Sequence, residues 1–246
     1  MSDAAPLLET RGLTKRFQGL VALSAISFRI AAGSIMGLIG PNGAGKSTLV
    51  SLIGGSLAAD SGDIRFEGRP IDRLPAYRRA RLGIGRTYQL ARPFPGLSAL
   101  DNVALGALFG AAGERDRARA RERAREWLDF VGLGPRAEQR AAGLGGPDRK
   151  RLEFAKALAM TPKLLLLDEV MAGLTPTEVD EVVDLIKRIR DRGVTILVIE
   201  HVVPAIRRLS DRLLVLNHGQ LIAEGEPATV LRDEGVIEAY LGRRRA

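Results

Sequence analysis

The chain has 246 residues, of which 46% are hydrophobic and 27% are charged, and these ordinary globular proportions exclude wholesale disorder. It contains no cysteine, which excludes disulfide bonds, thiolate metal sites and cysteine nucleophiles. A formal net charge of +8 is compatible with a polyanionic partner, but the arginines are scattered over several segments, which favours a basic composition without a specific partner.

The start of the chain and its hydropathy bear on where it works. The first residues, MSDAAP, lack the basic and then apolar run of a secretory signal. No stretch approaches the roughly 18 uncharged apolar residues that a membrane span needs. We therefore expect a chain that is soluble, or peripheral to another protein that spans the membrane.

The first part of the chain predicts strands around a glycine-rich turn. Partly alternating apolar and polar residues predict strands at 7–17 and 25–30. The apolar run at 35–39 predicts another strand, and residues 48–53 predict a helix that two glycines stop. Strand, glycine loop and helix in this order are typical of a phosphate-binding unit in a parallel sheet.

The glycine-rich turn matches the phosphate-binding pattern G-x-x-x-x-G-K-[ST]. Its residues are Gly40, Pro41, Asn42, Gly43, Ala44, Gly45, Lys46, Ser47 and Thr48. Glycines let successive backbone N–H groups face phosphate oxygens, and the following helix adds its positive N-terminal end. We expect Lys46 to reach the β- and γ-phosphates and Ser47 to bind Mg²⁺. The alternative, a chance glycine-rich turn, does not explain the flanking strand and helix.

The middle of the chain differs in composition from the rest. It opens with a loop at 92–96, Arg-Pro-Phe-Pro-Gly. Residues 114–126 are mostly Arg, Ala and Glu, with opposite charges three residues apart, which favours a solvated helix. We interpret residues 90–160, approximately, as a helical insert in an otherwise α/β domain.

Buried strands and a hairpin follow the insert. The apolar runs at 163–167 and 194–199 are typical of central strands in a parallel sheet. Between them, residues 178–191 have the apolar spacing of a helix. The runs at 213–216 and 221–223 flank Asn-His-Gly-Gln, which predicts a hairpin whose histidine, His218, has only a structural role.

Polar residues stand at the ends of the two buried strands. Asp168 closes the first, where nucleotide-hydrolysing sites place a carboxylate for Mg²⁺. Side chains alternate in direction along a chain, so Glu169 points elsewhere and is the candidate to polarise the attacking water. The alternative is an Asp-Glu pair that caps a helix in a surface loop.

His201 stands just past the second buried strand. Ligands bind at the carboxyl ends of parallel strands in open α/β sheets, so His201 is a candidate to hydrogen-bond a γ-phosphate. The alternative is a histidine with a structural role.

With these motifs in order, the chain resembles the ABC transporter ATPase family over residues 7–241. Within that family it is similar to ATP-binding subunits of branched-chain amino acid importers. The residues that carry this second likeness are LTKRF at 13–17, GIGRTYQ at 83–89, FPGL at 94–97, LDEVMAGLTPTE at 167–178 and AYLG at 239–242. Val170 stands where most ABC subunits have a proline.

The resemblance implies a fold: an α/β P-loop NTPase of the ABC type, with an N-terminal antiparallel β portion and a helical subdomain. It places the ATPase domain at 7–242, with a basic tail at 243–246. It also implies that Phe17 is the aromatic that stacks on adenine. Gln89 matches the glutamine that touches Mg²⁺ and the water and links the ATP site to the membrane subunit. A plain core role for Phe17 and a polar loop role for Gln89 remain alternatives.

Further roles follow by position in the resembling motifs. Asp168 and Glu169 match the Walker B aspartate and the catalytic glutamate, and His201 matches the switch histidine. Residues 172–175 match the D-loop, with Thr175 in place of the usual acidic end.

One departure from the family pattern bears directly on ATP. The signature, typically Leu-Ser-Gly-Gly-Gln, contacts the γ-phosphate of the ATP that the partner subunit holds. The residues here are Leu144, Gly145, Gly146, Pro147 and Asp148. Proline lacks the N–H that would face phosphate and cannot adopt a positive φ, and an acid repels phosphate unless it points away. We expect the ATP site that this segment completes to be weakened, while the chain's own phosphate loop works with an intact partner.

The function implied is ATP binding and hydrolysis, with Mg²⁺, to power a membrane ABC importer of branched-chain or related amino acids. The implied partners are permease subunits, a second ATP-binding subunit that is identical or a paralogue, and indirectly a substrate-binding protein, at the cytoplasmic face of the membrane. A second hypothesis is a nucleotide-binding coupling subunit with a degenerate signature and little hydrolysis at one of two sites; Glu169 and His201 argue against it. A third is a nucleic-acid-linked ATPase, but those relatives usually carry two cassettes in one chain, so we expect no nucleic acid.

Overall fold

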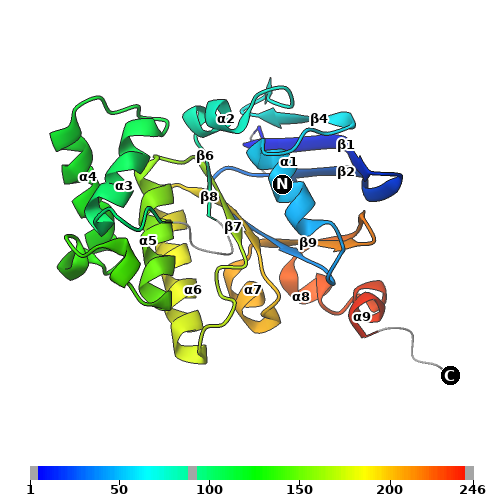
Figure 1. Ribbon diagram of the computed structural model, residues 1–246. Helices are drawn as coiled ribbons and strands as arrows, with labels where there is room; N and C mark the ends of the chain where they lie inside the picture. The colour runs from blue at the N-terminus through cyan, green and yellow to red at the C-terminus, as the bar shows by residue number, and fades with distance from the viewer. Residues whose placement is uncertain (1–4, 88–92, 242–246) are drawn as a thin grey trace.

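Two β-sheets organise the computed structural model, which describes residues 5–87 and 93–241 (Figure 1). The smaller sheet is antiparallel with the order β2-β1-β4-β5, formed by β1 (Leu8–Phe17), β2 (Leu20–Ile30), β4 (Ser61–Phe66) and β5 (Arg69–Pro70). The larger has the order β10-β9-β3-β8-β7-β6, formed by β3 (Ile35–Ile39), β6 (Ile84–Arg86), β7 (Leu164–Asp168), β8 (Thr195–Ile199), β9 (Arg212–Asn217) and β10 (Gln220–Gly225). All its strands are parallel except β10, which forms a hairpin with β9.

Helices surround the larger sheet, and a separate group of helices lies at one end of the molecule. Those around the sheet are α1 (Lys46–Gly54), α2 (Ala76–Leu82), α6 (Pro176–Asp191), α7 (Val203–Leu209), α8 (Pro227–Val230) and α9 (Glu234–Leu241). At the end of the molecule opposite the antiparallel sheet lie α3 (Ala99–Phe109), α4 (Arg117–Phe130) and α5 (Gly146–Ala159), with the 3₁₀ turns η1 (Gly134–Arg136) and η2 (Ala141–Gly143) (Figure 1). The α/β class with an antiparallel portion and a helical subdomain is therefore confirmed.

Strand β7 shows how one sheet serves two cores. Leu164 and Leu166 pack in the core that the antiparallel sheet and α1 share with the larger sheet. Leu165 and Leu167 pack on the other face, in the core formed with α5 and α6. All four side chains are fully buried, as expected for the centre of a parallel sheet that is covered on both faces. The continuous apolar run in the sequence has this physical cause.

Strand β2 and helix α4 differ most in extent from the sequence-based expectation. Strand β2 begins at Leu20 instead of residue 25, because a tight turn at residues 18–19 pairs Phe17 directly with Leu20. Helix α4 covers Arg117–Phe130 instead of residues 114–126. Its start is set by Asp116, whose side chain accepts a hydrogen bond from the N–H of Ala118 at 2.8 Å.

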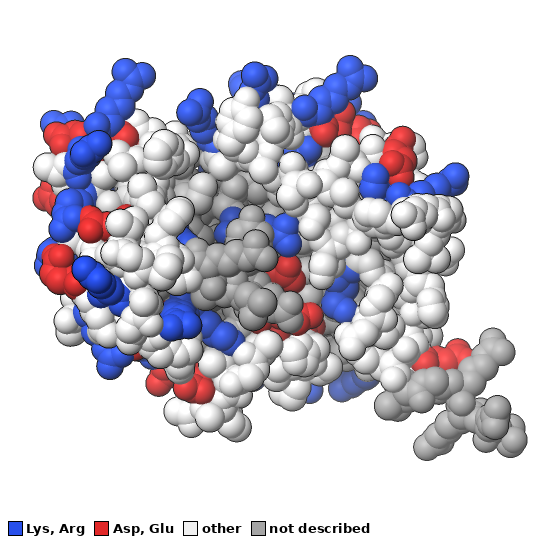
Figure 2. Space-filling view, viewed as in Figure 1, with Lys and Arg blue, Asp and Glu red and all other residues white. Residues whose placement is uncertain are grey.

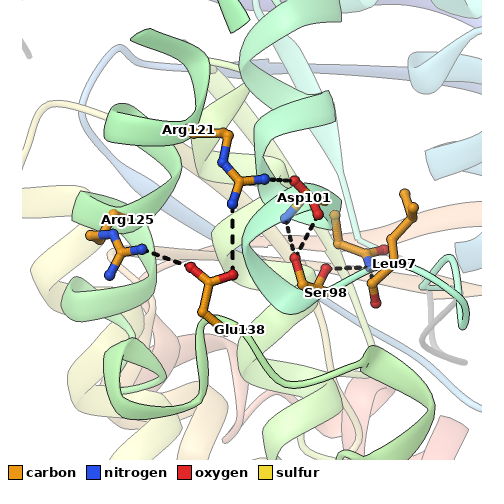
Figure 3. Close-up of polar contacts among 7 residues, drawn as sticks. Leu97, Ser98, Asp101, Arg121, Arg125 and Glu138 are labelled. Carbon is orange, nitrogen blue, oxygen red and sulfur yellow. Dashed lines mark hydrogen bonds and ion pairs between the residues drawn. The ribbon is translucent and has the colours of Figure 1, made fainter. Parts of the chain in front are cut away.

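Ion pairs bind α3 and α4 to the segment that follows them (Figure 3). Arg121 of α4 pairs with Asp101 of α3 and, at 3.6 Å, with Glu138, and Arg125 pairs with Glu138 at 2.8 Å. The hydroxyl of Ser98 caps α3 by accepting from the N–H of Asp101 at 3.0 Å. These side chains are largely exposed, so apolar packing supplies most of the stability of this part.

A buried arginine closes the end of α1, the helix that follows the glycine-rich loop. Arg79 is 2% exposed, and its guanidinium donates to the carbonyl oxygens of Leu52 at 2.6 Å and Ile53 at 2.9 Å. It also donates to Leu74 and Asp72, at 2.8 and 2.9 Å. Four carbonyl acceptors offset the cost of burying this cation and satisfy groups that a helix end leaves unbonded.

The basic residues do not form one continuous field on the face shown in Figure 2. Lys and Arg side chains are spread along the rim of this face, and acidic side chains lie beside several of them. Within the described ranges 5–87 and 93–241, no helix combines the length and the apolar character that crossing a bilayer requires.

Candidate active site

The glycine-rich loop leads from β3 into α1 and takes a shape that side chains would block. Gly40 has a φ of 154° and Gly45 a φ of 102°, which L side chains rarely adopt. A Cβ at Gly45 would lie 2.6 Å from the carbonyl oxygen of Ala22, and one at Gly40 would overlap the carbonyl of Leu216. The backbone thus forms a cradle that only glycine permits at these two positions.

The side chain of Lys46 folds back into this cradle. Its Nζ donates to the carbonyl oxygens of Gly40 at 2.6 Å and Pro41 at 2.9 Å, and the residue is only 8% exposed. Burial lowers the pKa of Lys46, while the nearby carboxylates of Glu169 and Asp168 oppose the shift. A cation held beside the N-terminus of a helix attracts anionic oxygens, so the loop is suited to terminal phosphates.

A cavity of about 670 Å³ opens over the loop. It is lined by Asn42, Gly43, Ala44, Gly45, Lys46, Ser47 and Thr48, by Leu20, Val21 and Ala22 of β2, and by Glu169 and His218. The structure therefore brings Glu169 to the phosphate loop, although 121 or more residues separate them in the sequence. The exposed side chains of Leu20 and Val21 supply an apolar wall that sequence reasoning missed.

Glu169 adopts a backbone conformation that is unusual for a glutamate. Its φ is 49°, and its N–H donates to the carbonyl oxygen of Ile199 at 3.0 Å. The helix-capping alternative is wrong, because the next helix, α6, is capped by Thr175 in a capping box with Glu178. Left-handed backbone at a non-glycine residue is strained and is common at functional sites.

Asp168 ends β7 with its carboxylate in an ion pair. Its Oδ2 lies 3.0 Å from the guanidinium of Arg86, the last residue of β6, and Asp168 is 7% exposed. Sequence reasoning quoted the motif that contains Arg86 but gave that residue no role. The signal was available: parallel strands β6 and β7 are neighbours, so their carboxyl ends lie at the same sheet edge.

The β9–β10 turn packs against the phosphate loop. The N–H of Gly219 donates to the carbonyl oxygen of Ala44 at 3.1 Å, and its carbonyl accepts from Ser24 at 2.8 Å. This brings His218, for which we expected only a structural role, to the wall of the cavity. No pattern in the sequence pointed to that placement.

The other residues predicted for this site lie at different distances from the cavity. His201 follows β8 and is exposed, and among the described residues it is not part of the cavity lining. Phe17 is 43% exposed at the end of β1, beside Leu20, and Lys15 lies over its ring at 5.5 Å. Gln89 lies outside the described residues.

The signature segment lies at the start of α5 and outside the cavity lining. Gly145, with a φ of −69°, caps the helix, Gly146 and Pro147 are its first residues, and Asp148 is in its first turn. The first N–H groups of a helix have no partner within it, so the helix loses nothing by having proline there. The carboxylate of Asp148 pairs with Arg136 of η1, which offsets its charge. Leu144 precedes this turn and is buried.

Comparisons with known proteins bear on this site. A family model described as "ABC transporter" matches residues 23–172, and one described as "Branched-chain amino acid ATP-binding cassette transporter" matches residues 220–246. The high-affinity branched-chain amino acid transport ATP-binding protein BraF of Pseudomonas aeruginosa is 36% identical over 96% of this chain and 98% of its own length. A ribose import ATP-binding protein of Rubrobacter xylanophilus is also 36% identical, over 97% of this chain but 47% of its own length.

Solved structures agree with these relatives. An ATP-binding cassette of an ABC transporter in its ADP conformation superposes with a TM-score of 0.87 at 31% identity, over 98% of this chain and 100% of that one. A dimeric cassette in a post-hydrolysis state, bound to ADP and Pi, gives a TM-score of 0.80 at 25% identity, over 89% of this chain and 98% of that one. Together with the cradle around Lys46 and the neighbouring Glu169, these matches establish that the chain belongs to the ABC transporter family, as one of its ATP-binding and ATP-hydrolysing cassettes.

Proposed function

We propose that this chain is the ATP-hydrolysing subunit of an importer for branched-chain or related amino acids. The observation that supports ATP hydrolysis is that one cavity is lined both by the cradle of Lys46 and by Glu169. The cargo is supported by the name of the family model at residues 220–246 and by relatives such as BraF.

Binding and hydrolysis divide between the two parts of the cavity. The backbone N–H groups at the start of α1 and Lys46 bind the β- and γ-phosphates of ATP. Leu20, Val21 and Phe17 form the apolar side toward the base. Glu169 accepts a hydrogen bond from the attacking water and orients it toward the γ-phosphorus. As the water oxygen forms a bond to the γ-phosphorus, the bond between this phosphorus and the oxygen that bridges to the β-phosphate breaks. ADP and phosphate then leave.

The residues at this edge suit Mg²⁺. Ser47 offers a hydroxyl at the cavity wall and Asp168 a carboxylate at the end of β7, while residues 5–87 and 93–241 contain no cluster of three or more carboxylate or imidazole ligands. Mg²⁺ favours such sparse sites, because water and nucleotide oxygens complete its shell. When bound, the ion neutralises charge on the transferred phosphoryl group. Gln89 is the third ligand that we propose.

A second cassette completes the ATP site. We infer that Leu144, Gly145, Gly146 and Asp148 face the ATP of the partner, whose own signature faces the loop of Lys46. Among the first three positions of α5, Pro147 removes one N–H, which leaves those of Gly146 and Asp148. His201 contacts the γ-phosphate once the two cassettes close. The coupling-subunit alternative finds no support in the comparisons, and α5 forms normally around the proline.

The permease subunits dock, in this proposal, beside residues 94–97. Phe94 is 54% exposed and Leu97 37% exposed, although both are apolar. Buried Asn102 fixes the position of Phe94, with its Oδ1 accepting from the Phe94 N–H at 2.8 Å and its Nδ2 donating to the Phe94 carbonyl at 3.0 Å. The segment follows Gln89 closely in sequence, so the proposed link to the membrane passes here. The cassette then lies at the cytoplasmic face of the membrane, with a substrate-binding protein as a further, indirect partner.

The hydrolytic assignment is tested by Glu169→Gln in the full chain with its partner subunits. Removing the carboxylate while keeping the shape should lower ATP turnover at least about 100-fold, with ATP binding retained. Lys46→Ala should lose magnesium-dependent ATP binding itself. Glu67→Gln, on the surface, is the control. Wild-type turnover in Glu169→Gln would remove Glu169 from the mechanism.

The cargo is tested separately, with the complete transporter in vesicles. ATP-driven uptake of leucine, isoleucine and valine is compared with uptake of ribose, because a ribose import relative has the same 36% identity over the part that matches. Uptake of the amino acids alone is the expected result. Uptake of ribose alone would overturn the cargo without affecting the ATPase assignment.

A further inference from the structure

A buried carboxylate lies one residue beyond β8, next to His201. Glu200 is 1% exposed, and its Oε1 accepts a hydrogen bond from the N–H of Met171 at 2.7 Å. Within the described part of the chain, its Oε2 has no hydrogen-bond partner. Burying a carboxylate with one oxygen unsatisfied opposes folding, so the residue calls for an explanation beyond stability.

A lysine from another element reaches the next peptide of the same loop. Lys150 of α5 donates through Nζ to the carbonyl oxygen of Ala172. It is half-buried, and burial lowers its pKa, while Glu200 and Glu178 oppose the shift. Between them, Glu200 and Lys150 bind two consecutive residues, Met171 and Ala172.

The segment that they hold, residues 170–175, begins directly after Glu169. The Glu169 N–H is bonded to Ile199 of β8, and its carbonyl oxygen accepts from Ala172 at 3.3 Å. Glu169 thus has its strained backbone fixed on one side by β8 and on the other by the residues that Glu200 and Lys150 bind. Along the backbone, Glu169 lies no more than three residues from the two residues that Glu200 and Lys150 bind.

We propose that Glu200 and Lys150 are positioning residues for ATP hydrolysis, which hold the 170–175 loop so that the Glu169 carboxylate faces the phosphate-loop cavity. This inference rests on the proposed role of Glu169. Neither side chain touches the reacting atoms, so their effect is on turnover through geometry. Because Lys150 lies in the helix that begins with the signature segment, the same contacts join that helix to the hydrolytic carboxylate.

A purely structural role makes a different prediction. Glutamine at position 200 keeps an acceptor for the Met171 N–H and removes the buried negative charge. Burial raises the pKa of the Glu200 carboxyl, which shows that desolvation disfavours this charge. If Glu200 only stabilised the fold, Glu200→Gln would lose activity only to the extent that the fold itself is destabilised. If it serves positioning, the neutral acceptor is weaker than the charged one and the loop loosens while the fold does not.

The experiment compares Glu200→Gln, Glu200→Ala and wild type in the full chain with its partner subunits. Glu200→Gln should lower kcat about tenfold, the effect of exchanging a charge-assisted hydrogen bond for a neutral one, with KM for ATP changed less than about twofold. Its melting temperature should equal or exceed that of wild type. Hydrogen exchange at the Met171 amide should accelerate in Glu200→Ala, which reports on the loop without any nucleotide.

Lys150 supplies the second arm. Lys150→Met should lower kcat about as much as Glu200→Gln, and Lys150→Arg should recover activity because it keeps charge and donors. The double variant Glu200→Gln, Lys150→Met should be no slower than about the slower single variant, since both act on one loop. Glu67→Gln and Lys163→Met remove an exposed pair of the same types, 2.6 Å apart, and should leave kcat unchanged.

The outcomes separate this inference from the proposed function. If wild type fails to hydrolyse ATP, or Glu169→Gln remains active, the proposed role of Glu169 fails. If Glu169→Gln is inactive while Glu200→Gln and Lys150→Met keep wild-type kcat, only the positioning role is overturned. A fall in kcat that is matched by a fall in melting temperature, in Glu200→Gln as in Glu200→Ala, would instead assign Glu200 to the fold.

Discussion

We propose that the phosphate loop and the signature segment both contact ATP, and the structure constrains the two segments very differently. Around Gly45 a Cβ would meet backbone at 2.6 Å, and Gly40 is equally closed. Around Gly145 and Gly146 nothing lies within 4 Å of where a Cβ would be. The first region is fixed from within the chain. The second faces open space, which a partner cassette fills in our proposal.

This difference bears on how each of the two segments tolerates a departure from the family pattern. A side chain added at Gly40 or Gly45 of the phosphate loop would collide with this chain's own backbone, so the fold itself requires glycine at these two positions. A changed residue in the signature segment, such as Pro147, meets no steric penalty from its own fold. In our proposal its consequences fall on the ATP that the partner cassette holds.

Alanine at two glycines gives the largest expected contrast. Gly45→Ala forces a side chain into a φ of 102° and against the carbonyl of Ala22, which together cost about 1–3 kcal/mol or more of loop distortion. ATP affinity should fall at least about tenfold. Gly146→Ala is the matched control, with free space and helical backbone, and should leave ATP affinity unchanged when equilibrium binding is measured on the isolated chain, where the signature segment faces no partner ATP. Equal losses in both variants would contradict the contrast.

Arg79, which supports the helix after the phosphate loop, should contribute more to the free energy of unfolding than Arg136, which pairs with Asp148 of the signature segment. Arg79→Met removes four hydrogen bonds to carbonyl oxygens, two of them at the end of α1, at a cost of about 3 kcal/mol. Arg78→Met, at an exposed neighbour, should change the free energy of unfolding by less than about 0.5 kcal/mol. Denaturant titration measures both. Arg136→Ala should cost no more than about 1 kcal/mol, because its pair with Asp148 is partly exposed.

Restoring glycine in the signature should give a gain. Pro147→Gly returns one N–H to the start of α5, and a net hydrogen bond of about 1 kcal/mol corresponds to roughly fivefold in rate. ATPase activity is measured in the assembled dimer, with the Pro147→Ala variant to separate the restored N–H from the flexibility of glycine. An unchanged rate in both would show that this segment does not limit hydrolysis.

The smallest effect concerns pH and the 170–175 loop. Burial raises the pKa of Glu200 above 4.5; Glu169 adds to the shift, while the Met171 N–H and His201 oppose it, with the charge of Lys150 nearby. The folded chain therefore binds more protons than the unfolded chain between the two pKa values. This contribution to stability is present at low pH and is lost as the pH rises through the folded value.

Glu200→Gln removes that dependence, so its free energy of unfolding relative to wild type should rise with pH above 4.5. Denaturant midpoints across a pH series measure it, with Glu67→Gln as the control for the substitution itself. A difference that stays flat with pH would mean that Glu200 has no raised pKa in the folded chain.

Local pattern was sufficient for most of the architecture. The apolar run that ends at Asp168, the glycine loop and the helical spacing of α6 each reflect contacts within a few residues or burial on both sides of a sheet. The start of α4 was placed three residues early, because composition showed the charges but not that Asp116 would cap the helix.

Contacts between distant segments could not be read from the sequence. The pairing of Arg86 with Asp168, the placement of His218 at the cavity and the four bonds of Arg79 each join elements that only the topology brings together. Glu200 is the clearest case, since its neighbour His201 matched a motif while its own side chain turned into the protein. Motifs marked the groups proposed to touch ATP, and the tertiary structure revealed the groups that hold them.

The alternating burial of β7 has a further consequence. Successive leucines of β7 pack in different cores. A shift of the strand register by one residue would move every side chain to the opposite core, so the packing strongly disfavours it. Packing therefore holds the strand on both of its faces. A cavity created in the core of the helical end, for example by Leu152→Ala in α5, should consequently change the position of Asp168 and Glu169 at the end of this strand, although Leu152 does not contact them directly.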